Sequence, residues 1–562
     1  MFNSKQNNLF GDDKATSASA FVKAGMKESA RTLSGNMAEK FSTTGNPFVD
    51  QFTSLGNYKV PRNPEDIFRD MSVLAARNLT LAVKFILYLR IITRVVNLFT
   101  GERTKTVQRG AGLRHESIMR MIWLHIYHPA VFYKNITLLI LAGSWKDIIQ
   151  MLSYDVQYNG WVHRKLDWQR IVQLIVAGLE NPNTHNLVKK YLPQIKAKSK
   201  CSTLEAQADN VIAKYICNEL FGNDIKHYKQ YRKLKTSGTA HQWQQLISQR
   251  RFLEIDFDTV HGRALAQMVS GKFLTNQGLD KKYEEWLSTK PVAKFTGFVH
   301  ELFQPYLYDC GLTLYFKYKF QEDTVNKQFA QLVETAKKDA NTSTSMIVVR
   351  DTSGSMQAIA AGTTIQCGNL AKALALFFSK MLPEGPFANA WIEFNSEAQM
   401  HYWEGATPTE QWQNDKSGYV GNTNFQSVID LFCEIRLDTS ISEEQFPTGI
   451  ICISDGEFDP ADLYKTNVEA AREKLLKAGF SPEYVKNFKI VLWDLRNNYY
   501  GLRSSTKFET YEDVENVFYF SGYDGSIMAF LTGTEYQKSE PKTAEELFSA
   551  AMDQELLNMI QV

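Results

Sequence analysis

The chain has 562 residues, of which 44% are hydrophobic and 12% aromatic, so it can bury large cores and should divide into two or more domains. Its six cysteines are scattered without a C-x-x-C pair, which argues against a disulfide-rich secreted scaffold and against a zinc site. The first residues lack a basic segment followed by an apolar core, so we expect no signal peptide and a cytoplasmic protein.

The net charge of +2 hides an uneven distribution along the chain. Residues 1–340 hold 47 Lys and Arg against 30 Asp and Glu (+17), whereas residues 341–562 hold 16 against 31 (−15). Residues 51–250 alone carry 29 basic and 13 acidic side chains, a pattern compatible with binding to a polyanion. Two solvated surfaces that attract each other at a domain interface would explain the asymmetry equally well.

Residues 1–45 are rich in Ser, Thr, Asn, Gly and Lys, which predicts a flexible N-terminal arm. From Asn46 to about Leu314, apolar residues at three- and four-residue spacing predict an all-α domain over residues 46–320, built from stacked helical hairpins. The expected helices are Pro64–Leu98, Glu116–Tyr127, Ala130–Ala142, Trp145–Ser153, Trp168–Leu179, Leu204–Leu220 and His241–Arg250.

The apolar stretch Leu79–Phe99 raises the question of a membrane helix. Three charged residues, Lys84, Arg90 and Arg94, interrupt it, and charges near the bilayer centre are costly. We therefore expect no membrane partner.

Two basic stretches stand out in the helical half. A predicted loop, Thr100–Ser117, combines cations with Gly110 and Gly112, so that backbone and side chains could both approach a phosphate. In the second, Lys226–Lys235, tyrosines alternate with cations, as in proteins that grip single-stranded RNA. A solvated basic helix face would also explain each pattern. The candidate RNA-binding residues are Arg103, Lys105, Arg109, Arg114, His115, Lys226, Lys229, Tyr231, Arg232, Lys233 and Lys235.

After Gln321 the pattern changes to strands that alternate with helices, which predicts a parallel α/β sheet over residues 321–535. The expected strands are Met346–Val349, Asn389–Phe394, Gly449–Ile453, Phe488–Leu495 and Asn516–Tyr519, with helices Leu370–Lys380, Asn424–Glu434 and Ala461–Ala478. Ligands of such sheets bind outside the carboxyl ends of the strands, where the topology switches direction.

The first of these strands runs into a loop that carries Asp351, Ser353 and Ser355, whose alternate side chains point the same way. Thr423, just before a helix, and Asp455, at the end of a later strand, should lie at the same edge of the sheet. Carboxylate and hydroxyl oxygens suit a hard cation, so we predict that these five residues bind Mg²⁺ or another divalent ion.

The order and spacing of these five residues resemble the metal-ion-dependent adhesion site of von Willebrand factor A domains. The resemblance implies a doubly wound, Rossmann-like domain in which Asp351, Ser353, Ser355 and Thr423 bind the ion and Asp455 acts through water. It further implies an open coordination position that takes the carboxylate of a protein partner.

Landmarks in the helical half resemble the TROVE family, the RNA-binding Ro autoantigen group, and its relatives of unknown function. They are GNPFVDQF near Asn46, the helix holding Leu79–Arg90, RGAGLRHE from Arg109, GSWKDIIQML from Gly143, Tyr231–Lys235 with Trp243–Ile247, and VFYFSGYDGSIMAFL from Val517. The resemblance covers most of residues 45–535 and implies an array of HEAT-like helical repeats closed by a von Willebrand A domain, which binds small structured or misfolded RNA. Ala111 and Leu113 depart from the family's usual R-G-G-x-G-E-R loop.

Catalytic motifs are missing from the sequence. There is no Walker A loop, no G-x-S-x-G elbow and no H-E-x-x-H pair among the ten histidines, and Ser353 stands where an aspartyl-phosphate transferase has a second carboxylate. We therefore expect a non-catalytic protein, and the TROVE resemblance implies a ribonucleoprotein scaffold or chaperone of the Ro type, either monomeric or part of a larger assembly. The alternative is an assembly component, cellular or from a phage particle, that uses the metal site without binding RNA.

The two halves should approach each other, because their charges are opposite and an open array would expose the apolar faces of its terminal helices. We therefore predict a ring or a deep arc. Within residues 536–562, Leu547, Phe548, Ala551, Leu556 and Ile560 recur at helical spacing and predict a C-terminal helix that docks on the body.

Overall fold

The fold is given by a computed structural model that describes residues 46–562 apart from gaps, the longer of which are 159–165, 237–241, 290–294, 309–312, 341–344, 460–466, 497–515 and 523–543. Before residue 46 it describes only β1 (Arg31–Leu33) and β2 (Glu39–Phe41), so most of the expected arm lies outside the described residues. The helical elements and a six-stranded, mostly parallel sheet confirm a mixed fold of the α plus α/β class.

The first helical group forms a single core from residues 48 to 231. Several of its helices begin at side chains that cap free backbone N–H groups, such as Asn63, Asp167 and Thr203. The helices are α2 (Pro47–Thr53), α3 (Pro64–Arg77), α4 (Leu79–Arg90), α5 (Arg114–Tyr127), α6 (Pro129–Ala142), α7 (Trp145–Gln157), α8 (Trp168–Glu180), α9 (His185–Tyr191), α10 (Leu204–Phe221) and α11 (His227–Thr236).

The predicted helix over Pro64–Leu98 is wrong in two places. Asn78 ends α3, and its side chain accepts from the Leu81 N–H at the start of α4, so one helix becomes two. Beyond Ile91 the β-branched run favours an extended chain, which forms β3 (Ile92–Phe99). The expected loop over Thr100–Ser117 is also wrong, because β4 (Arg103–Ala111) pairs antiparallel with β3 and Arg114 begins α5.

A second helical group connects the first group to the sheet. It consists of α12 (Gln242–Ser248), α13 (Gly262–Ser270), α14 (Phe273–Asn276) and α15 (Asp280–Thr289), with a core that also includes Phe320 of α17 (Lys319–Ala340). The long helix α17 was not expected from the sequence. It contacts α13 and α15 on one side and α16 (Val299–Phe303) and α19 (Pro408–Asn414) of the sheet region on the other.

The sheet has the order β12-β11-β10-β7-β8-β9, in which β9 is the one antiparallel strand. Its strands are β7 (Met346–Asp351), β8 (Ala390–Phe394), β9 (Ala398–Tyr402), β10 (Gly449–Ser454), β11 (Lys489–Asp494) and β12 (Val517–Ser521). The expected sheet was parallel throughout, and the hairpin to β9 was missed. A two-stranded hairpin, β5 (Leu307–Tyr308) and β6 (Thr313–Leu314), lies outside it.

Both faces of the sheet are covered. Met346 and Val348 of β7 join the core beneath α18 (Cys367–Ser379), whereas Ile347 and Val349 join the core on the opposite face. That opposite face packs on α20 (Phe425–Asp438), α21 (Asn467–Lys477) and α22 (Pro482–Asn487). This two-sided burial explains why β7 and β10 are apolar over consecutive residues rather than alternate ones.

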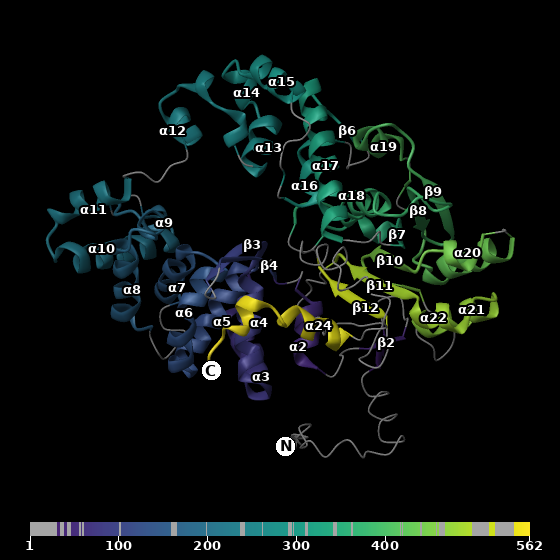
Figure 1. The fold of residues 1–562 in the computed structure, drawn as a ribbon, viewed down its shortest axis with the longest axis horizontal. Coiled ribbons are helices and arrows are strands. Elements are labelled where there is room, and N and C mark those ends of the chain that lie inside the picture. The colour runs from purple at the N-terminus through teal and green to yellow at the C-terminus, as the bar shows by residue number, and fades with distance from the viewer. Residues whose placement is uncertain are drawn as a thin grey trace.

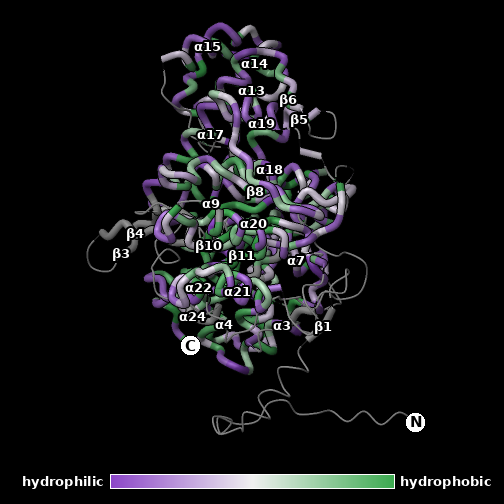
Figure 2. The backbone as a smooth tube through the Cα atoms, turned by 90° about the vertical axis from the view of Figure 1, so that its right-hand side faces the viewer, coloured by the Kyte–Doolittle hydropathy of each residue, from purple (hydrophilic) through white to green (hydrophobic). Residues whose placement is uncertain are grey.

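The chain follows a closed path in Figure 1: from α3 and α4 through α10 and α11, over α12 to α15, down α17 to the sheet, and back along α24 (Ala544–Met552) to α4. Phe548, Met552, Leu556 and Leu557 of α24 and α25 (Glu555–Asn558) belong to the first helical core. Figure 2 shows hydrophobic residues gathered on the sheet strands, with hydrophilic residues prominent around α15. Among the described helices, none is both long and apolar enough to cross a bilayer.

Candidate functional site

The predicted metal ligands lie where the sheet changes direction. β7 and β10 are parallel neighbours at the centre of the sheet, and the chain leaves β7 for β8 on one side and reaches β10 on the other. Asp351 is the last residue of β7, and Asp455 directly follows β10, so both carboxylates sit at the carboxyl edge of adjacent strands. Loops that diverge from such a point leave a crevice for a ligand.

Hydrogen bonds hold the Asp351 carboxylate together with Ser353 and Ser355, two of the predicted ligands. The Ser353 backbone N–H donates to Asp351 Oδ1 over 2.7 Å, and the Ser454 hydroxyl donates to Asp351 Oδ2 over 2.5 Å. The Ser353 and Ser355 hydroxyls are 3.0 Å apart. Three of the five predicted ligands therefore form one contiguous oxygen cluster.

Asp351 and Asp455 are 0% and 1% exposed, and the charge of Asp455 acts on Asp351. Burial first, and then the negative charge of Asp455, raise the pKa of Asp351 to about 7, although the bonds from Ser454 and Ser353 act in the opposite direction. Two buried carboxylates in one place favour a cation between them.

Thr423 lies in the loop before α20, and its side chain is 2% exposed. Backbone hydrogen bonds fasten this loop to the neighbouring ones: the Val420 N–H donates to Thr352 O over 2.9 Å, and the Asp459 N–H donates to Thr423 O over 2.9 Å. The loops that carry Asp351, Thr423 and Asp455 are thus joined at one edge of the sheet.

Sequence reasoning missed three neighbours of this cluster. Ser454 bonds Asp351, and the Arg496 guanidinium lies 3.3 Å from Asp455 Oδ2. Asp494 ends β11 and pairs in register with Ser454. Its carboxyl group lies close to Gly456, because a Cβ on that glycine would stand 2.8 Å from the carboxyl carbon of Asp494. The rule that selected Asp351, a carboxylate at the carboxyl end of a parallel strand, would have found Asp494 as well.

The donor set fits a hard divalent ion. The part of the chain that the structure describes holds no group of three or more His, Cys, Asp and Glu side chains placed for a metal, and the present set instead combines two carboxylates with three hydroxyls. Magnesium prefers oxygen ligands, retains waters and needs few carboxylates, and these residues offer oxygens only. Asp351, Ser353, Ser355, Thr423 and Asp455 are therefore the residues that would hold it.

The predicted RNA contacts in the β3–β4 hairpin cannot all be placed. Arg103, Lys105 and Arg109 lie on β4, and their side chains are outside the described ones. Gly110 and Gly112 contact the backbone at the end of α4, and their expected approach to a phosphate stays a prediction. A Cβ on Gly110 would stand 2.4 Å from Tyr88 O, and the Gly112 N–H donates to Ile91 O over 2.8 Å.

Arg114 and His115 both contact side chains of the helical group, but the Arg114 side chain is still 40% exposed, so a role in RNA binding stays a prediction. Arg114 Nε lies 2.9 Å from Asp147 Oδ1. The buried Arg90 binds the same carboxylate, with its Nε 2.7 Å from Asp147 Oδ2. His115 Nδ1 lies 3.0 Å from Tyr154 Oη, and burial lowers its pKa. RGAGLRHE and GSWKD, two landmarks of the TROVE resemblance, therefore meet through an ion pair.

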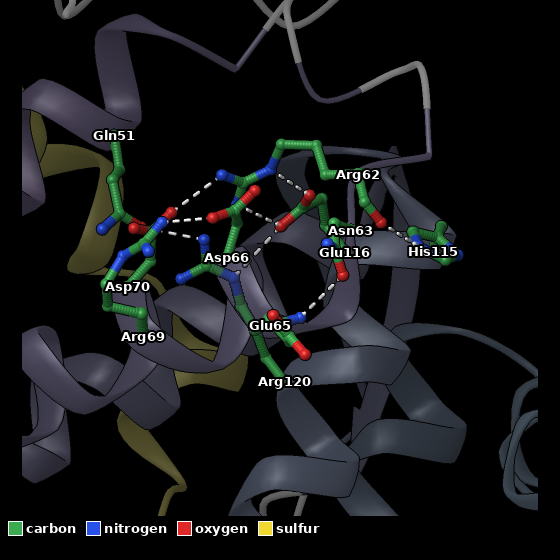
Figure 3. A network of polar contacts seen from close by, with 10 residues as sticks. All are labelled: Gln51, Arg62, Asn63, Glu65, Asp66, Arg69, Asp70, His115, Glu116 and Arg120. Carbon is green, nitrogen blue, oxygen red and sulfur yellow. Dashed lines mark hydrogen bonds and ion pairs between the residues drawn. The ribbon is translucent and has the colours of Figure 1, made fainter. Parts of the chain in front are cut away.

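Figure 3 shows the network beside His115. The Arg62 guanidinium donates to both oxygens of Glu116, over 2.7 and 3.0 Å, and to Asp70 over 2.8 Å. Arg120, 0% exposed, reaches Glu116 and donates to Gln51. Burial would raise the pKa of Glu116, but Arg62 and Arg120 together lower it. The carboxylate is thus held charged inside the helical core, where its contribution is structural.

In the second basic stretch, Lys226–Lys235, most of which forms α11, the predicted residues separate into two sets. Tyr231 is 0% exposed and its hydroxyl donates to Pro193 O over 3.0 Å, so it offers no face to a base, and this corrects its expected stacking role. Lys235 donates to Leu192 O. Lys226 is exposed and pairs with Asp224 over 2.8 Å. Lys229, Arg232 and Lys233 are also exposed and lie on one helix.

One comparison with known families bears on the sheet region. Residues 345–558 match the model of a domain of unknown function, DUF7788. The DUF7788 match starts at β7 and ends in α25, so it contains all five candidate metal ligands and also the C-terminal helices that pack on the helical core. No curated protein matches the chain.

Proposed function

We propose that the chain is a non-catalytic binding protein whose sheet region holds a divalent cation and docks a protein partner through it. The observation that carries this proposal is the pair of buried carboxylates, Asp351 and Asp455, at the ends of adjacent strands, with the bonded Ser353 and Ser355 hydroxyls in the loop after Asp351. When bound, Mg²⁺ would supply an open coordination position for an anionic oxygen, such as a carboxylate of the partner.

The strand order also supports assigning the sheet region to the von Willebrand A type. Numbered from β7 in chain order, the strands run 3-2-1-4-5-6 across the sheet, which is the classic doubly wound order, and the candidate ligands flank strands 1 and 4. We assign the first helical group to a HEAT-like array of the TROVE type on the landmarks quoted above.

A metal titration tests the docking site. Millimolar Mg²⁺ should raise the thermal unfolding temperature of the full chain, because an ion that binds only the folded state stabilises it. Asp351→Asn, which keeps the side-chain shape, should abolish the shift, whereas Asp430→Asn, at an exposed carboxylate of α20, should preserve it. The absence of a shift in the wild-type protein, or an equal shift in Asp351→Asn, would refute the metal site.

A second function is supported by α11. We propose that Lys229, Arg232 and Lys233 bind phosphates of a small structured RNA. They are exposed on one helix, and they belong to the segment in which basic residues exceed acidic ones by 29 to 13. The buried Tyr231 anchors that helix, so phosphate contacts rather than base stacking would supply the affinity.

Salt dependence tests the RNA proposal. Each phosphate neutralised releases counterions, so the logarithm of the affinity should fall with the logarithm of the salt concentration by about 0.7 to 0.9 per contact. The double variant Lys229→Glu, Lys233→Glu should weaken binding and flatten that slope, whereas Lys281→Glu on α15 should change neither. Equal binding by the double variant and Lys281→Glu would refute the role of α11.

A further inference from the structure

A cavity in the first helical group lies outside both sites described above. Its volume is about 660 Å³, and it is lined by His125, Pro129, Ala130, Tyr133, Lys134, Asp167 and Arg170. These residues come from the end of α5, the first turns of α6 and the start of α8, which lie together at the lower left of Figure 1. The cavity is larger than an inorganic ion needs and lies in the range of small-ligand sites.

The charges around the cavity favour an anion. Lys134 and Arg170 are both exposed, and neither has an ion-pair partner among the residues that the structure describes. The Arg170 guanidinium lies 3.6 Å from the centre of the Tyr133 ring, which holds it at the cavity wall. Asp167 is the one carboxylate of the lining, and it accepts from the Arg170 N–H over 3.1 Å as the cap of α8.

The first turn of α6 adds donors to the same place. The helix has 14 residues, begins with Pro129, and has no side-chain cap on its free N–H groups. Such groups, with the positive end of the helix dipole, bind phosphates in many proteins. Here the helix end lies at a cavity that also contains two cations.

His125 is an independent sign of a missing acceptor. It is 8% exposed, and its Nε2 lies 3.1 Å from Tyr133 Oη and accepts from the Asp167 N–H over 3.4 Å. Since a backbone N–H donates to Nε2, the proton of the neutral ring is on Nδ1, and burial lowers the pKa of this histidine. Nδ1 has no hydrogen-bond partner among the described residues, so the imidazole retains a donor for a ligand oxygen.

We propose that this cavity binds the terminal phosphate of a nucleotide. Lys134, Arg170, the N-terminus of α6 and the His125 N–H would contact the phosphoryl oxygens. Tyr127 is 56% exposed and lies two residues before α6, so its ring would be available for the base to stack on. The nucleotide could be free or the end of an RNA strand. The inference does not depend on RNA binding by α11.

Calorimetric titration of the full chain with adenosine monophosphate and with adenosine tests the site. The monophosphate should bind saturably and adenosine should not. Lys134→Gln and Arg170→Gln should each weaken binding by about tenfold, the effect of losing one charge-assisted hydrogen bond. Both side chains are exposed, so both variants should fold, and Lys281→Gln on α15 is the matched control. Tyr127→Ala should weaken binding of the monophosphate and leave that of inorganic phosphate unchanged.

Further arms identify the source of the phosphate. If strand ends bind here, a short RNA with a 5′-phosphate should displace the monophosphate. If neither this RNA nor its 5′-hydroxyl form displaces the monophosphate, the site binds free nucleotides. The α11 variant Lys229→Glu, Lys233→Glu should not affect the monophosphate, so this site and the RNA proposal can fail separately. The inference is overturned if adenosine binds as well as its monophosphate, or if Lys134→Gln and Lys281→Gln behave alike.

Discussion

At the scale of single residues, the sheet region contains a second buried charge cluster. Arg350 Nη1 and Lys372 Nζ lie 2.5 and 3.2 Å from Asp415 Oδ2, and all three side chains are at most 5% exposed. Burial lowers the pKa of Lys372 to about 8, although Asp415 opposes the shift. Burial would raise the pKa of Asp415, but the two cations lower it well below its usual range. One carboxylate therefore compensates two buried cations.

We predict that Asp415→Asn lowers the free energy of unfolding by about 3 to 5 kcal/mol at neutral pH, because it leaves two cations buried without their counter-charge.

A carboxyl whose pKa is lowered by folding stabilises the folded state above its unfolded pKa, near 4, and that contribution is lost as the pH falls through the lower, folded value. The wild-type protein should thus lose stability below pH 4 and the variant should lose less. Urea unfolding at several pH values measures both, with Asp430→Asn as control, and an equal loss in all three proteins would contradict the prediction.

The sequence predicts where some candidate residues lie in the fold but not which partners others contact, for a physical reason. Asp351 and Asp455 follow apolar strands, and strand ends are visible in a hydropathy pattern. For Arg114 and Tyr231 the sequence shows a charge and a ring but not their partners. Arg114 pairs with Asp147, 33 residues away, and Tyr231 bonds Pro193, 38 residues away. Ser454 and Arg496 matter through a neighbouring strand, whose position only the fold supplies.

At the scale of elements, the β3–β4 hairpin meets the end of α4 through Gly110. A Cβ at this position would stand 2.4 Å from Tyr88 O and 2.6 Å from Ile91 Cβ, closer than real contacts allow. Because Tyr88 contributes a backbone atom, the clash cannot be relieved by a side-chain rotation. The glycine therefore allows the strand to approach the helix.

We predict that Gly110→Ala lowers the free energy of unfolding by about 1 to 3 kcal/mol, the usual cost of overpacking a well-filled site. Chemical denaturation would measure it. Gly418→Ala is the matched control, because a Cβ there would meet nothing within 4 Å. If the two variants were equally stable, Gly110 would not be a packing residue.

Tyr231 provides a second test at the element scale. Tyr231→Phe removes the hydroxyl that donates to Pro193 O and should cost about 1 kcal/mol of stability or slightly more. RNA affinity should be unchanged, because the ring is 0% exposed. Loss of RNA affinity without loss of stability would restore the stacking role expected from the sequence.

The elements differ in how far the sequence reveals them. Helices α5 to α8 are amphipathic or strongly apolar, and their existence follows from the spacing of the apolar residues. Helix α17 was missed because polar residues dominate it and mask the few apolar contacts it makes with both neighbouring cores. β9 was missed because its residues are mostly half-buried or exposed at the sheet edge.

At the scale of the whole molecule, α2 and the C-terminal helices α24 and α25 belong to one core. Asn135 Nδ2 donates to Gln561 O over 2.6 Å, and the Gln561 N–H donates to Asn135 Oδ1 over 3.0 Å. The sequence predicted a docked C-terminal helix from its apolar spacing, but it did not identify the receiving surface, which α2 and α4 provide. Spacing gives the face of a helix, and the tertiary fold decides what that face meets.

Phe548 of α24 is the centre of this closure. Its ring centre lies 5.6 Å from those of Phe48 and Phe52 and 5.9 Å from that of Phe85, and the side chain is 2% exposed. Since these rings come from α2 and α4, one side chain joins the end of the chain to its beginning.

We predict that Phe548→Ala lowers the free energy of unfolding by about 3 to 5 kcal/mol, because it removes a buried ring and leaves a cavity among three others. Helices α24 and α25 should also become more sensitive to proteolysis, since they lose an anchor on α2 and α4. Met559→Ala, at a side chain 37% exposed in the same segment, is the control. If both variants unfold at the same urea concentration and are cleaved at the same rate, the closed path does not depend on this contact, and the C-terminal helices would be held by the polar bonds around Asn135 instead.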